Sequence, residues 1–353
     1  AQQQTELNRY YSGSPIYPDR FQTNWNRSYI MFPDTKPKGV VVMLHGLTDT
    51  PYSLRHIAEN YRQHGFIAIG IRLPAHGTVP GALTKVTWQD WLAATRLAVR
   101  EAKKLAGNEV PLHIVGFSNG GAMKYTLDAL NDPLLAKPQR VILISPMIGV
   151  TRFARFSGVA GWPSFLPAFA KAAWLTIMPE FNPFKFNSFP TNAARQSFLL
   201  TSALQAQIAA DSRNKKLDQL PPIMTFQSAM DSTVSARAVI TALYNRLPVN
   251  HSEVVLFDLN HAVRFNALLR SSSYTALSRL LPTPPRRYDT TIITNAAAGS
   301  TEMEIRTIPA GKTEQIVEKM GLRYLPDVDS LSHVALPFPM TDSLYGRYPE
   351  PQN

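Results

Sequence analysis

The stretch that decides the fold is Leu112–Gly121, which reads LHIVGFSNGG. Its first five residues form a continuous apolar run, which is typical of a strand buried on both faces. The residues from 121 to 130 suit an amphipathic helix, and a G-x-S-x-G sequence, Gly116–Gly120, lies between the two. A tight turn from strand to helix exposes the hydroxyl of its central serine and needs small neighbours. We therefore predict that Ser118 is a nucleophile.

The same alternation extends outward from this turn in both directions. Strands that alternate with helices predict a mostly parallel sheet with helices on both faces. The apolar runs that predict strands are 40–44, 66–71, 112–116, 141–144, 222–226 and 254–257. The segments that suit helices are 52–64, 88–105, 121–130 and 235–246.

Two segments interrupt this alternation and set the predicted domain boundaries. Residues 147–215 are rich in aromatics and broken by prolines, with Glu180 as the only acid between Met147 and Pro190, so we predict a cap or lid insertion. Residues 283–353 form a predicted C-terminal extension, with strand-like stretches at 289–294 and 302–308 and a short helix ending near Gly321. The other predicted parts are an N-terminal arm, 1–38, and the two core parts, 39–146 and 216–282.

Composition excludes several classes of function. The 353 residues contain no cysteine, which excludes disulfides, thiolate metal sites and a cysteine nucleophile. The net charge of +11 is compatible with anionic surfaces or simply with solubility, and no basic run is typical of a nucleic-acid module. The histidines lack metal-ligand spacing and no phosphate loop is present, so we expect no metal, no organic cofactor and no nucleic-acid partner. The sequence contains no apolar run of about 18 residues, so we predict no transmembrane helix.

The N-terminal residues leave the compartment open. The chain begins with the polar stretch Ala1–Gln4 rather than with a methionine. This start is compatible with an exported protein, periplasmic or secreted, whose signal peptide has been removed. We expect that location, with the cytoplasm as the alternative.

The motifs together resemble the monoacylglycerol lipase and carboxylesterase branch of the α/β-hydrolase superfamily, a branch also grouped with serine aminopeptidase S33-like hydrolases. The matching stretches are HGLTDTP at 45–51, LPAHGT at 73–78, WQDW at 88–91, GFSNGG at 116–121 and AMDSTVS at 229–235. The resemblance covers residues 38 to 260, with Ala75 where the family usually has glycine. It implies an α/β-hydrolase fold, here with a cap insertion and a C-terminal extension, and a serine carboxylic-ester hydrolase without a cofactor.

Two backbone amides are predicted to form an oxyanion hole. The loop after the first strong strand carries His45, Gly46 and Leu47, and in this fold that loop supplies one donor. The second donor is the amide that follows the nucleophile. We therefore predict the N–H groups of Leu47 and Asn119 as donors, with His45 orienting the loop and His76 in a structural role.

The acid and the base of the triad are taken from the resemblance. Asp231 follows the fifth predicted strand, where the family keeps the acid that orients the histidine. Two histidines compete for the role of base. His261 lies just after the sixth strand, whereas His333 lies in a Ser-x-Ser-His-Val sequence near the C-terminus. We favour His333, with His261 as the alternative.

The substrate prediction depends on the cap. Its aromatic, acid-poor composition predicts an apolar acyl pocket under a lid, although the aromatics could equally serve to pack the cap on the core. Our first choice is a small-molecule ester of a lipid or another apolar acid, with peripheral membrane-surface contact through the cap. The alternatives are a peptidase or amidase with the same triad, and a binding protein on a hydrolase fold without catalysis.

Overall fold

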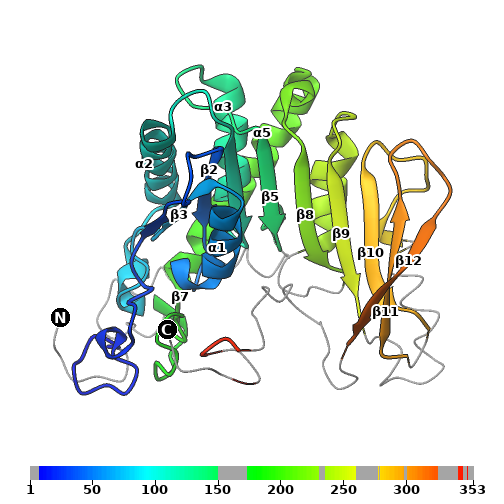
Figure 1. The fold of residues 1–353 in the computed structure, drawn as a ribbon. Coiled ribbons are helices and arrows are strands. Elements are labelled where there is room, and N and C mark those ends of the chain that lie inside the picture. Colours follow the sequence, from blue (N-terminus) through cyan, green and yellow to red (C-terminus); the bar gives the residue numbers. More distant parts are fainter. Residues whose placement is uncertain are drawn as a thin grey trace. The chain divides into compact units, whose positions relative to one another are not determined.

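The apolar runs of the first half of the chain become neighbouring strands in the computed structural model (Figure 1). Four strands lie side by side in the order β1 (Tyr29–Met31), β3 (Phe66–Ile71), β2 (Gly39–Leu44) and β4 (Leu112–Phe117). β2 is parallel to both β3 and β4, and β1 is antiparallel to β3. All six residues of β2 are buried, as expected for a strand between two others in a covered parallel sheet.

The structure describes residues 8–149, 173–229, 235–259, 277, 279–297, 300–324, 341–344 and 348. Its contacts divide the chain into two units. The first unit comprises Ala1–Pro138, Arg152–Leu200 and Leu336–Asn353, and the second comprises Gln139–Thr151 and Thr201–Ala335.

Helices of the first unit pack directly on its strands. The helical elements are η1 (Pro18–Arg20), η2 (Pro51–Leu54), α1 (Arg55–Gln63), η3 (Pro80–Thr84), α2 (Trp88–Ala106) and α3 (Gly121–Asn131). α1 packs on β3, α2 packs on β2 and β3, and α3 packs on β4 and α2. A capping box between Thr87 and Asp90 begins α2, and Gly107, at φ +89°, ends it.

The N-terminal arm is fastened to the segment around residues 180–186, which follows the short strand β6 (Trp174–Thr176) that pairs with β7 (Phe189–Pro190). Arg9 forms a salt bridge of 2.5 Å with Glu180, and both side chains are fully buried. The same guanidinium donates to the carbonyls of Pro183 and Lys185, so all three of these contacts are with residues far from Arg9 in sequence. The one acid between Met147 and Pro190 is therefore a structural anchor.

The second unit contains parallel strands followed by antiparallel ones (Figure 1). Its strands in spatial order are β5 (Arg140–Ile144), β8 (Ile223–Ser228), β9 (Glu253–Asp258), β10 (Asp289–Asn295), β11 (Glu302–Ile308) and β12 (Ile316–Arg323). The strands from β5 to β10 are parallel, whereas β11 is antiparallel to both β10 and β12. Its helical elements are η7 (Lys216–Gln219), α6 (Ala236–Ala238), η8 (Val239–Leu243) and η9 (Tyr244–Arg246), and α5 (Thr191–Arg213) starts in the first unit and ends in the second.

The C-terminal strands contain one correction to the sequence analysis. The strands expected at 289–294 and 302–308 correspond to β10 and β11, but the expected helix ending near Gly321 is wrong. That stretch is β12, and seven of its eight residues are exposed. Because an exposed strand needs no apolar alternation, its sequence lacks the pattern that predicts a strand, and pairing with β11 decides its structure. No helix within the described ranges is long and apolar enough to cross a membrane.

Candidate active site

Ser118 occupies a strained turn between β4 and α3. Its backbone has φ of +60°, a region that non-glycine residues rarely adopt. The amide of Asn119 donates to the carbonyl of Phe117 over 2.6 Å, which closes a three-residue turn centred on the serine. Strained residues of this kind cluster at functional sites, and the turn has the strand-to-helix context expected of a nucleophile.

The start of α3 lies directly after the serine. The Asn119 side chain accepts a hydrogen bond of 2.9 Å from the amide of Gly121, so it caps the first turn of the helix. Free amides at a helix start carry partial positive charge, which favours a developing anion. The predicted backbone donor, Asn119 N–H, is used within the turn, and its bond to Phe117 must lengthen before that amide can bind an oxyanion.

The loop after β2 lies against this turn, because β2 and β4 are parallel neighbours that end at the same edge. A Cβ atom placed on Gly46 would lie 3.5 Å from the Cβ of Ser118 and 3.3 Å from the ring of Phe117. A larger residue at Gly46 would therefore push the loop away from the serine. The structure thus brings together the loop of Leu47, Ser118 and Asn119, three of the predicted site residues.

His45 holds the first peptide group of this loop. Its Nε2 accepts a hydrogen bond of 3.0 Å from the amide of Leu73, so the ring proton must be on Nδ1. Nδ1 lies 2.8 Å from the carbonyl oxygen of Gly46 and donates to it. Burial lowers the pKa of His45 well below its usual range, so the ring stays neutral at pH 7. Because the Gly46 carbonyl and the Leu47 N–H belong to one planar peptide, His45 also fixes the direction of the predicted donor.

His76 holds the next peptide group. Its Nε2 lies 2.7 Å from the carbonyl oxygen of Leu47, and its Nδ1 lies 3.0 Å from that of Pro74. Burial lowers its pKa, and we assign the proton of the neutral ring to Nε2, which makes the shorter contact. The ring also meets His45 edge-on, with 4.9 Å between the ring centres. The two histidines therefore support consecutive carbonyls of the loop after β2, consistent with the roles predicted for them.

Asp49 is a buried acid of the same loop that the sequence analysis missed. Its Oδ1 accepts 2.9 Å from the amide of Thr50, and its own amide donates to the carbonyl of Gly46. Burial raises the pKa of Asp49 to about 6, although a hydrogen bond from Ser53 partly opposes this rise. The only feature of the sequence that could have indicated Asp49 was an aspartate in a turn close to Gly46.

The segment 183–187 packs against the same loop. The amide of Phe186 donates to the carbonyl of Thr48 over 2.7 Å, and the hydroxyl of Thr50 donates to the carbonyl of Phe184 over 2.7 Å. The rings of Phe184 and Tyr52 stack with centres 4.3 Å apart. Two aromatics of the predicted cap stretch therefore brace the loop after β2 instead of lining a free surface.

A C-terminal residue binds next to this region within the same unit. The carboxylate of Asp342 forms an ion pair with Arg55 and accepts 2.8 Å from Nε2 of His56. Its other oxygen accepts from the Tyr52 hydroxyl at 3.3 Å and from the Leu344 amide at 3.0 Å. The Asp342 side chain is fully buried, so the chain near its C-terminus is anchored on η2 and α1.

The remaining predicted site residues lie outside the described residues. These are Asp231, His333 and the alternative base His261, and the part of the cap at 150–172 lies outside as well. Within the described ranges, no group of three or more His, Asp or Glu residues is placed to hold a metal ion.

Comparison with known protein families shows to which family this chain belongs. The model of the family described as serine aminopeptidase, S33 matches residues 35–263, which include the loop after β2 and the Ser118 turn. This chain belongs to the serine aminopeptidase S33 family. The predicted relationship to the lipase and esterase branch of the α/β-hydrolases is confirmed.

Individual relatives agree with this membership. A thermostable monoacylglycerol lipase from Bacillus sp. (strain H-257) is 25% identical over 205 residues, which cover 58% of this chain and 74% of the relative. A structure of the metagenome-derived lipolytic enzymes LipS and LipT matches with a TM-score of 0.52 and 18% identity, covering 72% of this chain and 97% of the other. A soluble variant of the monoglyceride lipase from Saccharomyces cerevisiae matches with a TM-score of 0.51 and 10% identity, covering 65% and 81%. The predicted α/β-hydrolase fold is therefore confirmed.

Proposed function

We propose that this chain cleaves esters of apolar acids through an acyl intermediate on Ser118. That the chain is a carboxylic-ester hydrolase is supported by its family and by its lipase and esterase relatives. The observation that carries the proposal is the strained Ser118 turn, with φ of +60°, held against the Gly46 loop. Such a turn costs free energy and gives a nucleophile access to a carbonyl carbon.

The proposed chemistry follows from the groups around the serine. The Ser118 oxygen attacks the ester carbonyl while a histidine accepts its proton. The negative charge on the carbonyl oxygen is stabilised by the N–H groups of Leu47 and Asn119, and the histidine then protonates the leaving alcohol. Water, deprotonated by the same histidine, releases the acid and restores Ser118. His45 and His76 act as positioning residues because they hold the loop peptides.

We propose His333 as the base and Asp231 as its acidic partner, with His261 as the alternative base. The anchoring of Asp342 on Tyr52, Arg55 and His56 supports a C-terminal segment that returns to the unit containing Ser118. In the proposed triad, the acid fixes the tautomer of the histidine and stabilises its charged form.

The proposed preference for apolar acyl groups is supported by the stretch 175–181, which begins within β6. Four of its apolar side chains are exposed: Leu175, Ile177, Met178 and Phe181. An exposed apolar cluster of this kind suits contact with a lipid aggregate or a long acyl chain. The proposal therefore includes contact between the cap and a lipid surface.

Covalent labelling tests the nucleophile. A fluorophosphonate should modify the wild-type protein at Ser118, which peptide mass spectrometry would locate. Ser118→Ala should prevent labelling and lower kcat for a p-nitrophenyl ester on the order of 10⁴-fold, with an unchanged circular dichroism spectrum. An active, folded Ser118→Ala variant, or a label on another residue, would overturn the assignment.

A matched pair of histidine variants tests the base. His333→Ala should lower kcat as severely as Ser118→Ala, because triad members act as a unit. His261→Ala should lower the unfolding midpoint more than the rate. The opposite order of severity would identify His261 as the base.

An amidase is the second candidate, because the family is described as a serine aminopeptidase. A panel of acyl esters and aminoacyl amides with matched acyl groups distinguishes the two, since the proposal expects the higher kcat/KM for esters. A folded protein that neither reacts with the fluorophosphonate nor cleaves either class would instead support a binding protein without catalysis.

A further inference from the structure

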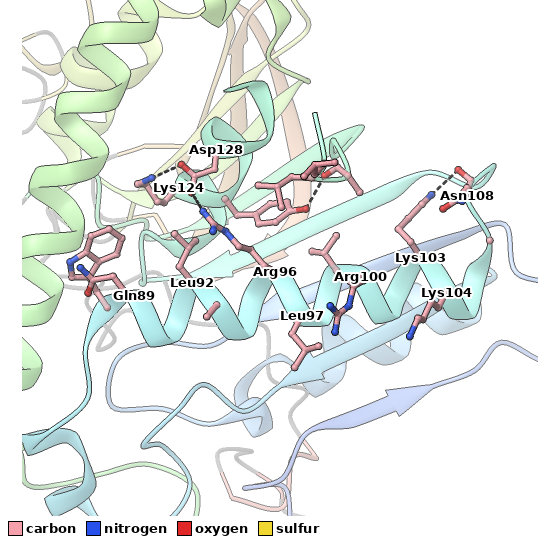
Figure 2. A pocket seen from close by; sticks show the side chains of 18 residues that line it. Gln89, Leu92, Arg96, Leu97, Arg100, Lys103, Lys104, Asn108, Lys124 and Asp128 are labelled. Atoms are coloured by element: carbon pink, nitrogen blue, oxygen red, sulfur yellow. Dashed lines mark hydrogen bonds and ion pairs between the residues drawn. The ribbon is translucent and has the colours of Figure 1, made fainter. Parts of the chain in front are cut away.

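A second site lies between α2, α3 and the loop at 134–136, all within the first unit. Figure 2 shows an open groove along one side of α2, with Gln89 at one end and Lys104 at the other. Its volume is about 1090 Å³, near the upper end of pockets that bind drug-sized molecules, about 300–1,000 Å³. None of the predicted triad or oxyanion residues lines it.

The groove carries an excess of positive charge. Among the described residues that line it, Asp128 is the only acid, against five basic residues: Arg96, Arg100, Lys103, Lys104 and Lys124. Asp128 is shared by Arg96 at 3.0 Å and Lys124 at 2.5 Å, as Figure 2 shows. The positive charge of this part of the groove is therefore partly neutralised.

At the end of the groove near the C-terminus of α2, the positive charge is less neutralised. Lys103 donates to the carbonyls of Asn108 and Val110, which takes up donors, and no acid among the described residues forms an ion pair with it. Arg100 and Lys104 share the carboxylate of Glu101, at 3.5 Å and 3.2 Å, and their side chains are 69% and 67% exposed. Since exposed ion pairs are weak, one carboxylate leaves both cations able to bind a further anion.

Leucines line the same groove beside these cations. Leu92 and Leu135 belong to its wall, and Leu97 and Leu134 are 51% and 91% exposed. A helix face that simply contacts solvent would place polar residues there. A concave surface with cations and exposed leucines is complementary to a molecule with an anionic head and an apolar chain.

We propose that this groove binds a carboxylate amphiphile, with the carboxylate at Arg100 and Lys104 and the alkyl chain against the leucines. Ester hydrolysis releases a carboxylate, and the choice of a long alkyl chain rests on the proposed preference for apolar acyl groups. The groove is therefore a second site for the acid that the reaction produces, separate from the serine turn.

Binding of decanoate to protein whose active-site serine carries a fluorophosphonate label tests the proposal. Titration calorimetry should show saturable binding of decanoate, whereas acetate and decyl maltoside bind at least about tenfold more weakly, because each lacks the chain or the charge. The double variant Arg100→Glu, Lys104→Glu should weaken decanoate binding by about tenfold or more. The control Arg27→Glu, Lys36→Glu makes the same charge change at exposed positions outside the groove and should leave binding within about twofold.

Three outcomes would overturn the inference. They are equal binding of decyl maltoside, equal binding of acetate, or equal effects of the groove and control variants. Leu97→Ser provides an independent check, since it should weaken decanoate but not acetate. Failure of the proposed function would be visible separately, because Ser118 would then not take the label.

Discussion

The two parts of the segment 175–187 contain the same kinds of residue but use them differently. Phe184 and Phe186 are buried, and their backbone groups bond to Thr50 and Thr48 of the loop after β2. A few residues earlier, apolar side chains from Leu175 to Phe181 are exposed, and Phe181 is 65% exposed. We call the first part the anchored segment (183–187) and the second the exposed hairpin (175–181).

The difference shows that aromatic enrichment in the predicted cap has two physical meanings. In the anchored segment, burial of rings and backbone hydrogen bonds stabilises the loop beside Ser118. In the exposed hairpin, the ring of Phe181 and three aliphatic or thioether side chains remain in water and are available to a substrate or a surface. The packing interpretation therefore describes the anchored segment, whereas the acyl-pocket interpretation stays a prediction for the exposed hairpin.

Truncation of the anchored aromatics should have the largest effect. Phe184→Ala or Phe186→Ala removes a buried ring and should lower the free energy of unfolding by about 3–5 kcal/mol. Activity should fall as well, because the loop of Leu47 loses its support. Phe181→Ala is the matched control in the exposed hairpin and should stay within about 0.5 kcal/mol. Urea titrations of the three variants measure this contrast, and equal losses at Phe181 and Phe186 would remove the distinction between the two parts.

The anchored segment should also make the stability of the protein depend on pH in a way that the exposed hairpin does not. The reason is that Asp49 belongs to the loop that the anchored segment contacts. Burial raises the pKa of folded Asp49 from 3.8 to about 6, so the folded state favours the neutral carboxyl. Its contribution to stability is complete below about pH 3.8 and is lost as the pH rises through about 6. Asp49→Asn should therefore be more stable than wild type at pH 8, by at most about 3 kcal/mol, and equal to it near pH 4.

Unfolding midpoints of wild type and Asp49→Asn, measured side by side from pH 4 to 8, test this sign. The comparison at each pH cancels the contribution of neutral His45, whose lowered pKa makes both proteins less stable as the pH falls below about 6.5. A variant that is less stable at pH 8 than at pH 4, relative to wild type, would mean that the folded state favours the ionised carboxylate and lowers the pKa of Asp49 instead of raising it.

Much of the fold could be predicted because its buried strands are continuous apolar runs in the sequence. The predicted runs at 66–71 and 112–116 differ from β3 and β4 by at most one residue. β12 was missed because it is exposed and carries no apolar pattern. The Ser118 turn was predictable because its glycines, strand and helix are adjacent in sequence.

The supports of the site could not be predicted, since they depend on contacts between distant residues. His45 accepts from Leu73, and Asp342 binds Arg55, and no local pattern encodes either pair. The excess of basic residues in the α2–α3 groove was likewise hidden, because the sequence shows only that cations recur along one helix.

Substitution in the exposed hairpin should have the smallest effect on stability and the most selective effect on activity. Phe181→Ser should leave the free energy of unfolding within about 0.5 kcal/mol, because the ring is already in water in the free protein. If the ring contacts a long acyl chain, burial of a phenylalanine is worth about 1.5–3 kcal/mol, so kcat/KM for a decanoate ester should fall by about tenfold. An acetate ester is too short to reach it and should be cleaved at the wild-type rate. Phe32→Ser, at a similarly exposed ring of the N-terminal arm, is the matched control and should change neither rate. If Phe181→Ser lowers both rates equally, the hairpin supports the site as the anchored segment does, and exposure in the free protein does not mark residues that select the acyl chain.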